Sequence, residues 1–218
     1  MKNLPMFSEF LKQFKPILYR RKERIVLPGE EMNNVYYIAQ GYVTQSILSP
    51  NGNEFTPYIF APNSLFPLIL LRENNQSDDH EYEYESLTPV EIYRIPKEKL
   101  IQFLKENSET LLAVNEQLTL YSTELLKKLE TRIFSNALHI VILGLLDLAK
   151  LFGKIKGKQT LINYWFTHQD IANISGLSRE VVTKEMNKLI KKKLVDYDNH
   201  FIVITNIKSL EEELQSEI

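Results

Sequence analysis

The sequence predicts an α+β fold: an N-terminal antiparallel β-roll (jelly-roll-like), a long helix, and a C-terminal winged helix-turn-helix. Three observations predict it. Short runs rich in Tyr, Phe, Ile and Val alternate with turn signals between about Arg20 and Ile95. The stretch from Ser108 to about Arg132 contains neither Pro nor Gly. Residues 166–184 read as two short helices joined by a glycine turn. The expected domains are residues 1–107, 108–134 and 135–218.

Composition permits this architecture and excludes several chemistries. A chain of 218 residues can bury enough core for two modest domains. Zero cysteines exclude disulfides, zinc–thiolate sites and cysteine-ligated iron–sulfur clusters. No apolar run reaches membrane length, and Met1–Pro5 has no signal-peptide character, so we expect a cytoplasmic protein without membrane contact.

In the first region, turn residues delimit short strands. Met6–Leu18 reads as a short helix interrupted by Pro16. Pro50-Asn51-Gly52 lies between two apolar runs and is a strong hairpin signal. Pro96 then opens a helix that reaches Leu104.

The long helix carries an apolar heptad pattern. Leu111, Leu118 and Leu125 recur every seven residues, and Val114 and Tyr121 lie between them at steps of three and four. This is the spacing of a short coiled-coil seam. We expect the five residues to form a dimer interface; the alternative is a helix that packs on the core of its own domain. Next, Ser135-Asn136 could cap a helix over 137–151 and act as the hinge between the halves.

The helix-turn-helix is indicated by capping residues. Thr167 is a good N-cap with Asp170 three residues later, a variant of the capping box. Gly176 suits a turn that needs a positive φ. Ser178 then caps a second helix. Its inward-facing residues are Val181, Val182, Met186, Leu189 and Ile190.

The outer face of the second helix has side chains that can read bases. Arg can donate two hydrogen bonds to guanine, Glu can accept from cytosine, and Thr and Lys can reach a base edge or a phosphate. The alternative is an amphipathic hairpin with an ordinary solvated face. We expect DNA contacts from Thr167, His168, Gln169, Ser178, Arg179, Glu180, Thr183, Lys184, Lys188 and Lys191.

The surroundings of the motif favour the DNA interpretation. From residue 150 to 210, ten lysines and one arginine oppose five acidic residues, whereas residues 1–132 are slightly acidic. Residues 194–197 and 201–205 read as strands around a polar turn at Asp198-Asn199-His200, which predicts a wing. The acidic Glu211-Glu212-Glu213 reads as a solvated terminus.

At this point the sequence resembles the Crp/Fnr superfamily of bacterial transcription regulators. The residues that carry the resemblance are Thr167-His168-Gln169-Asp170-Ile171-Ala172, Ser178-Arg179-Glu180-x-x-x-Lys184, Pro28-Gly29-Glu30 and Val35–Val43. It covers about Tyr19 to Ile207 and implies an effector-sensing β-roll (residues 1–107), dimerisation through the long helix, and a palindromic operator loosely like TGTGA-N6-TCACA. Lys184 departs from the Arg common in the family. The lack of cysteine excludes the oxygen-sensing chemistry of one branch.

The region expected to bind an effector also departs from the family's cyclic-nucleotide binders. Those members carry Gly-Glu-Leu followed by Arg and a small hydroxyl residue, whereas this chain has Leu65-Phe66-Pro67-Leu68 and Arg72-Glu73. Burying a cyclic phosphate without a paired cation would cost several kcal/mol, so we expect that cyclic AMP is not the ligand. An apolar effector pocket could be lined by Tyr58, Phe60, Phe66, Leu68, Arg72, Tyr82 and Tyr84, which could equally be plain core.

Other candidate sites are weaker. Asp78-Asp79-His80-Glu81 followed by Glu83 and Glu85 could hold a cation, but the alternating tyrosines favour a half-exposed strand. Gly153–Lys158 has the wrong spacing for a phosphate loop and reads as a loop after a helix. No catalytic constellation, metal site or cofactor is expected.

The sequence therefore predicts a non-enzymatic, homodimeric DNA-binding regulator, with RNA polymerase and an unidentified effector as further partners. The alternative is a ligand-binding or scaffold protein of the same fold that binds a protein instead of DNA.

Overall fold

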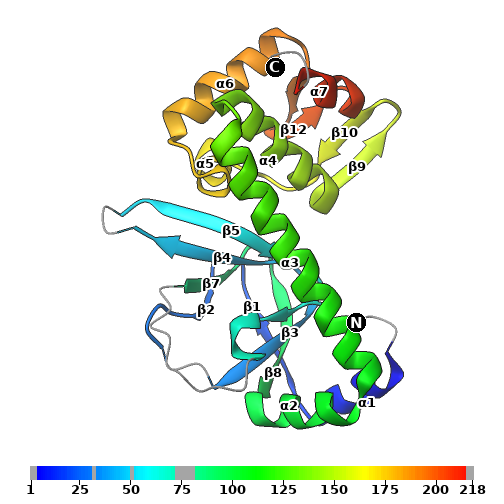
Figure 1. The fold of residues 1–218 in the computed structure, drawn as a ribbon. Coiled ribbons are helices and arrows are strands. Elements are labelled where there is room, and N and C mark those ends of the chain that lie inside the picture. Colours follow the sequence, from blue (N-terminus) through cyan, green and yellow to red (C-terminus); the bar gives the residue numbers. More distant parts are fainter. Residues whose placement is uncertain (1–3, 31–32, 50–51, 72–81, 215–218) are drawn as a thin grey trace. The chain divides into compact units, whose positions relative to one another are not determined.

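The computed structural model describes residues 4–30, 33–49, 52–71 and 82–214 of the chain (Figure 1). The chain divides into two compact units. The first comprises residues 1–52 and 56–126, and the second residues 53–55 and 127–218. The boundary between the two units falls within the long helix, after Leu126.

The first unit is a β-roll flanked by helices. Its strands are β1 (Pro16–Tyr19), β2 (Arg24–Val26), β3 (Asn34–Gln40), β4 (Val43–Leu48), β5 (Glu54–Phe60), β6 (Leu65–Phe66), β7 (Tyr82–Ser86) and β8 (Val90–Pro96). Its helices are α1 (Pro5–Leu11), the 3-10 turn η1 (Leu68–Leu71), α2 (Lys97–Glu106) and the first part of α3 (Ser108–Phe134).

Two four-stranded sheets face each other in this unit, which confirms the predicted antiparallel roll. One has the order β1-β8-β3-β6 and the other β2-β7-β4-β5. The pairs given by register are antiparallel, as in β3 and β8, where Val35 opposes Ile95. Buried side chains from both sheets form one apolar core.

The predicted first helix is too long. The helix ends at Leu11, and Pro16 begins strand β1 instead of interrupting a helix. Proline lacks the backbone N–H that a helix interior needs, while it is tolerated at the start of an edge strand. Phe7 and Phe10 are buried and attach the short helix to the core.

Helix α3 packs on the roll along the predicted seam. Val114 is 3% exposed and belongs to the core of the first unit, with Leu118 and Tyr121 packed against it. The Gln117 side chain donates to the Leu65 carbonyl (2.8 Å) and accepts from the Leu65 N–H (3.0 Å). The Tyr121 hydroxyl donates to Gln45 Oε1 at 3.1 Å. This face of α3 is therefore used inside its own unit.

The second unit contains helices α4 (Ala137–Phe152), α5 (His168–Ser175), α6 (Arg179–Lys191) and α7 (Ile207–Glu213). Its strands are β9 (Gly153–Lys156), β10 (Gln159–Ile162), β11 (Val195–Asp198) and β12 (Phe201–Ile204), in the sheet order β11-β12-β10-β9. The predicted cap of α4 is confirmed, because the Asn136 side chain accepts from the His139 N–H at 3.0 Å.

Two segments differ from expectation. Gly153–Lys158, interpreted as a loop, begins an antiparallel hairpin that turns at Gly157 (φ +64) and extends the sheet of the wing. The acidic segment at 211–213, interpreted as a solvated terminus, ends helix α7. Leu210 is fully buried there, and Glu213 makes an ion pair with Lys192.

Candidate nucleic-acid interface

Helix α5 begins with a complete capping box. Thr167 Oγ1 accepts from the Asp170 N–H at 3.1 Å, and Asp170 Oδ2 accepts from the Thr167 N–H at 2.8 Å. The two bonds satisfy backbone donors that a helix start leaves unpaired. This confirms the predicted cap and fixes where the first helix of the motif begins.

The turn between α5 and α6 depends on Gly176. Its φ of +62° and ψ of +34° lie in the left-handed region, which glycine adopts without steric cost. Arg132, in the last turn of α3, donates to the Ser175 carbonyl at 2.9 Å and to the Gly176 carbonyl at 2.5 Å. The guanidinium thus caps the C-terminal end of α5.

Helix α6 has a buried side and an exposed N-terminal tip. Ser178 caps it by accepting from the Val181 N–H at 3.3 Å. Val182, Met186 and Leu189 are fully buried, as predicted. Arg179 and Lys184 are exposed.

The carboxylate of Glu180, also exposed, accepts from its own backbone N–H and from the Ser178 hydroxyl, and these bonds hold its pKa below the usual range. The tip therefore presents two cations and one ionised carboxylate to solvent.

The lysines farther along α6 have different surroundings. Lys188 Nζ lies 2.7 Å from Oε2 of the buried Glu185, so its charge is already neutralised within the helix. Lys191 is exposed at the last position of α6. Gln169 is exposed on α5, where its amide donates to Asn173 Oδ1 at 2.7 Å.

His168 and Thr183 lie in a hydrogen-bond chain that the sequence did not reveal. His168 Nδ1 lies 2.8 Å from Thr183 Oγ1 on α6, and His168 Nε2 lies 2.9 Å from the Tyr197 hydroxyl on β11. Burial, and next the charge of Arg179, lower the pKa of His168. Burial raises the pKa of Tyr197. Contacts of this kind cannot be found by spacing, because the three residues lie on three elements.

The wing is confirmed as a tight hairpin. Asp198 opposes Phe201 in the β11–β12 register, so the loop consists of Asn199 and His200. Both have positive φ, 47° and 73°, as a two-residue turn of the type that suits twisted strands requires. The Trp165 ring lies 6.0 Å from that of His200.

The residues expected to line an effector pocket form part of the core. Phe60, Phe66, Leu68 and Tyr84 are buried, and the Phe66 ring centroid lies 5.2 Å from that of Tyr84. Tyr58 and Tyr82 are partly buried against the same cluster. This arrangement corresponds to the alternative of plain core. Arg72 and Asp78–Glu81 lie outside the described residues.

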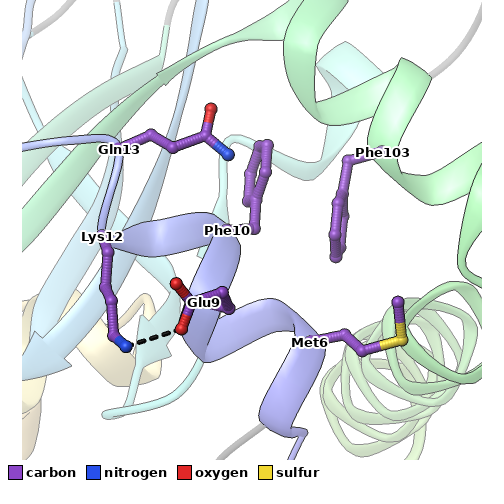
Figure 2. A pocket seen from close by; sticks show the side chains of 6 residues that line it. All are labelled: Met6, Glu9, Phe10, Lys12, Gln13 and Phe103. Atoms are coloured by element: carbon purple, nitrogen blue, oxygen red, sulfur yellow. Dashed lines mark hydrogen bonds and ion pairs between the residues drawn. The ribbon is translucent and has the colours of Figure 1, made fainter.

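A pocket of about 420 Å³ is found elsewhere in the first unit, between α1 and α2 (Figure 2). Its floor is the stacked pair Phe10 and Phe103, whose ring centroids are 4.2 Å apart. Met6, Glu9, Lys12 and Gln13 surround this pair, and Lys12 bonds Glu9.

On α3, apolar side chains remain exposed outside the predicted seam. Of the five predicted interface residues, Leu111 is 47% exposed, whereas Val114 is core and Leu118 and Tyr121 contact it; Leu125 is partly exposed. The other exposed apolar residues of the helix are Leu112, Leu120, Leu126, Leu129, Ile133 and Phe134.

Among the residues that the structure describes, no group of three or more His, Asp or Glu side chains could hold a metal ion. None of the helices built from those residues has the length and apolar character needed to cross a bilayer.

Two family models match the chain, in an order that agrees with its two units. Residues 16–107 match the cyclic nucleotide-binding domain, and residues 141–213 match the Crp-like helix-turn-helix domain. The first coincides with the β-roll and the second with α4 to α7. A roll of this kind followed by a winged helix-turn-helix defines a class of proteins, the DNA-binding transcription regulators.

Known proteins support the same assignment. The chain is 29% identical to the global nitrogen regulator of Nostoc sp. (strain PCC 7120 / SAG 25.82 / UTEX 2576), over 88% of this chain and 86% of that protein. It is 23% identical to the CRP-like cAMP-activated global transcriptional regulator of Mycobacterium tuberculosis, over 91% and 88% of the two chains.

Solved structures agree in fold. The c-di-GMP-responsive global regulator CLP of Xanthomonas campestris superposes with a TM-score of 0.80 at 21% identity, over 91% of this chain and 97% of that one. A CRP/FNR-family regulator of Thermus thermophilus gives 0.77 at 19%, over 94% and 100%. The chain belongs to the Crp/Fnr superfamily of transcription regulators.

Proposed function

We propose that the chain acts as a homodimer on a palindromic operator, with the N-terminal tip of α6 in the major groove. The observation that carries this proposal is the exposure of Arg179, Glu180 and Lys184 on the first two turns of α6, a helix whose opposite side is fully buried. A recognition helix docks by that end, with its first residues against base edges.

The tip residues divide into two roles. Arg179 donates to a guanine and Glu180 accepts from a cytosine, so that each half-site contains a specified G·C pair. Lys184 reaches the next base edge or a phosphate. Gln169, Ser178 and the cap residue Thr167 contact the phosphate backbone, as helix N-termini commonly do.

Basic residues beyond the tip add sequence-independent affinity. Lys191 is exposed and contacts phosphate, whereas Lys188 contributes less because Glu185 neutralises its charge. Such contacts position the protein on the duplex without reading it.

Dimerisation takes place through the exposed side of α3. The predicted seam is largely used within the first unit, but Leu126, Leu129 and Ile133 are 66%, 56% and 63% exposed and follow one another at steps of three and four residues. Leu112 lies two heptads before Leu126 on the same stripe. A second copy of this helix would bury these four side chains in a parallel seam and relate two recognition helices by a two-fold axis.

The effector, where one acts, is not cyclic AMP. The region from Leu65 to Glu73, which corresponds to the phosphate-binding stretch of cyclic-nucleotide binders, lacks their Gly-Glu pair and small hydroxyl residue. Buried rings of Phe60, Phe66 and Tyr84 fill the interior of the roll. An effector would act by binding one spacing of the two recognition helices better than the other. Micromolar, stoichiometric binding of cyclic AMP in a calorimetric titration would refute this.

The second candidate function is a scaffold that binds a protein partner through the basic second unit. RNA polymerase is a further proposed partner of the DNA-bound regulator.

A salt titration separates DNA binding from the scaffold role. Anisotropy of a labelled random-sequence duplex should show affinity that falls steeply and linearly on a log–log plot as salt rises, with a slope set by the number of phosphates neutralised. Lys191→Ala should reduce that slope by about one for each bound subunit, whereas Lys12→Ala, which changes an exposed lysine just after α1, should leave it unchanged. Absence of duplex binding at low salt would favour the scaffold.

A further inference from the structure

We propose that His168 is a positioning residue that holds the recognition helix and the wing in one fixed arrangement, an inference that rests on the proposed DNA-binding function. It replaces the expectation that His168 contacts DNA itself. Three residues from three elements form this connection: His168 at the start of α5, Thr183 on α6 and Tyr197 on β11.

The distances show that both ring nitrogens of His168 are occupied. Nδ1 lies 2.8 Å from Thr183 Oγ1, and Nε2 lies 2.9 Å from the Tyr197 hydroxyl. The imidazole is partly buried, and its ring centroid lies 6.5 Å from that of Tyr197. A side chain with both nitrogens bonded inside the protein has no free donor to offer a phosphate.

The direction of each bond follows from the donor inventory. Thr183 Oγ1 lies 2.8 Å from the Arg179 carbonyl, which can only accept, so the threonine hydroxyl donates there. Its oxygen must then accept from His168 Nδ1–H. With the proton on Nδ1, Nε2 has a lone pair and accepts from the Tyr197 hydroxyl. The chain therefore runs from Tyr197 through His168 and Thr183 to the backbone of Arg179.

The charges around the ring favour this neutral state. Among the described residues, Arg179 is the charged group that acts on His168, and it disfavours the imidazolium. Tyr197 is the other titratable group in contact; a tyrosine is protonated at neutral pH at its ordinary pKa, and burial raises the pKa of Tyr197 further.

The consequence for DNA recognition is geometric. The last acceptor of the chain is the carbonyl of Arg179, the first residue of α6. The first donor lies on the strand that leads into the wing turn. His168 thus fixes the position of the wing relative to the N-terminal tip of α6. The wing and this tip must contact the same duplex at once. A misplacement of either would weaken binding without removing any direct contact.

A double-mutant cycle in operator affinity tests the inference, using the full chain and a duplex selected from a random pool. Tyr197→Phe deletes the donor. His168→Asn keeps an amide N–H near the position of Nδ1 and has nothing at Nε2. Loss of one such bond should weaken binding about three- to tenfold in either variant. The double variant should bind no worse than either single one, because both act through the same bond. Tyr19→Phe in β1 serves as the matched control.

Each outcome decides the matter. Independent losses that multiply, or a loss in His168→Asn with none in Tyr197→Phe, would mean that His168 contacts DNA directly and would overturn the proposal. A wild-type chain that enriches no duplex would instead overturn the proposed function.

A measurement without DNA tests the positioning role of His168 independently of the proposed DNA-binding function. In full-length protein labelled with ¹⁵N-histidine, one of four histidines should show the Nδ1–H tautomer, and Thr183→Val should abolish that preference. An Nε2–H tautomer of His168 in the wild type would contradict the proton chain.

Discussion

The turn of the helix-turn-helix allows a quantitative test with a matched control. Gly176 and Gly157 have nearly the same φ, +62° and +64°, so a Cβ at either position meets the same backbone penalty of about 1 kcal/mol. The surroundings differ. A Cβ on Gly176 would lie 2.2 Å from Arg132 Nη1, whereas a Cβ on Gly157 meets nothing within 4 Å.

The magnitude follows from what Arg132 would lose. Displacing its guanidinium removes the bonds to the Ser175 and Gly176 carbonyls. Arg132 is exposed, so we assign each charge-assisted bond about 1 kcal/mol, below the usual range. Gly157→Ala should therefore lower the free energy of unfolding by about 1 kcal/mol and Gly176→Ala by about 3 kcal/mol.

Urea denaturation followed by Trp165 fluorescence measures these losses, because this single tryptophan lies in the second unit. In an Arg132→Ala background the excess of about 2 kcal/mol should vanish, since the bonds are already gone. Equal losses for the two glycine variants, or an excess that persists without Arg132, would show that the guanidinium does not hold the turn.

Arg179→Ala should weaken operator binding by about 1–3 kcal/mol per half-site and relax its specificity, whereas Lys191→Ala should weaken all sequences alike; equal losses on operator and random DNA for both would contradict this division. Thr167→Ala should lower the free energy of unfolding by about 1 kcal/mol in urea melts, and no change would mean that the capping box is unimportant. Phe66→Ala, at a fully buried ring, should cost about 3–5 kcal/mol in thermal unfolding of the roll, and a near-neutral result would instead indicate an open pocket. The pKa of His168 is lower in the folded state than its unfolded value near 6.5, because burial disfavours the imidazolium. The stability that neutral His168 contributes should therefore be complete above about pH 7 and decline as the pH falls below 6.5. Thermal melts at several pH values in which His168→Asn leaves that decline unchanged would contradict this linkage.

Local rules sufficed to predict the helix-turn-helix and the turn of the wing. The helix caps and tight turns depend on immediate neighbours in the chain. In the structure, Thr167 and Ser178 are N-caps, and Gly176 and the Asn199–His200 turn have positive φ. Capping and positive-φ requirements are backbone properties that a few residues determine.

Features that depend on tertiary partners were predicted less well. The heptad of α3 marks an apolar stripe, but periodicity cannot say whether a second chain or the roll covers it, and Val114 is covered by the roll. The β9–β10 hairpin was missed because Ile155, at 81% exposed, lies alone between lysines and only pairing with the sheet makes it a strand. The partners of His168 lie 15 and 29 residues away, beyond any local signal.

Selection of bound duplexes from a random DNA pool tests the central claim most directly. The structure and its proposed dimer predict enrichment of a palindrome whose half-sites lie about one helical turn apart, each with a G·C pair whose preference disappears in Arg179→Ala. Enrichment of no sequence, of an asymmetric one, or of the same palindrome by the Arg179→Ala variant would contradict base reading by the tip of α6.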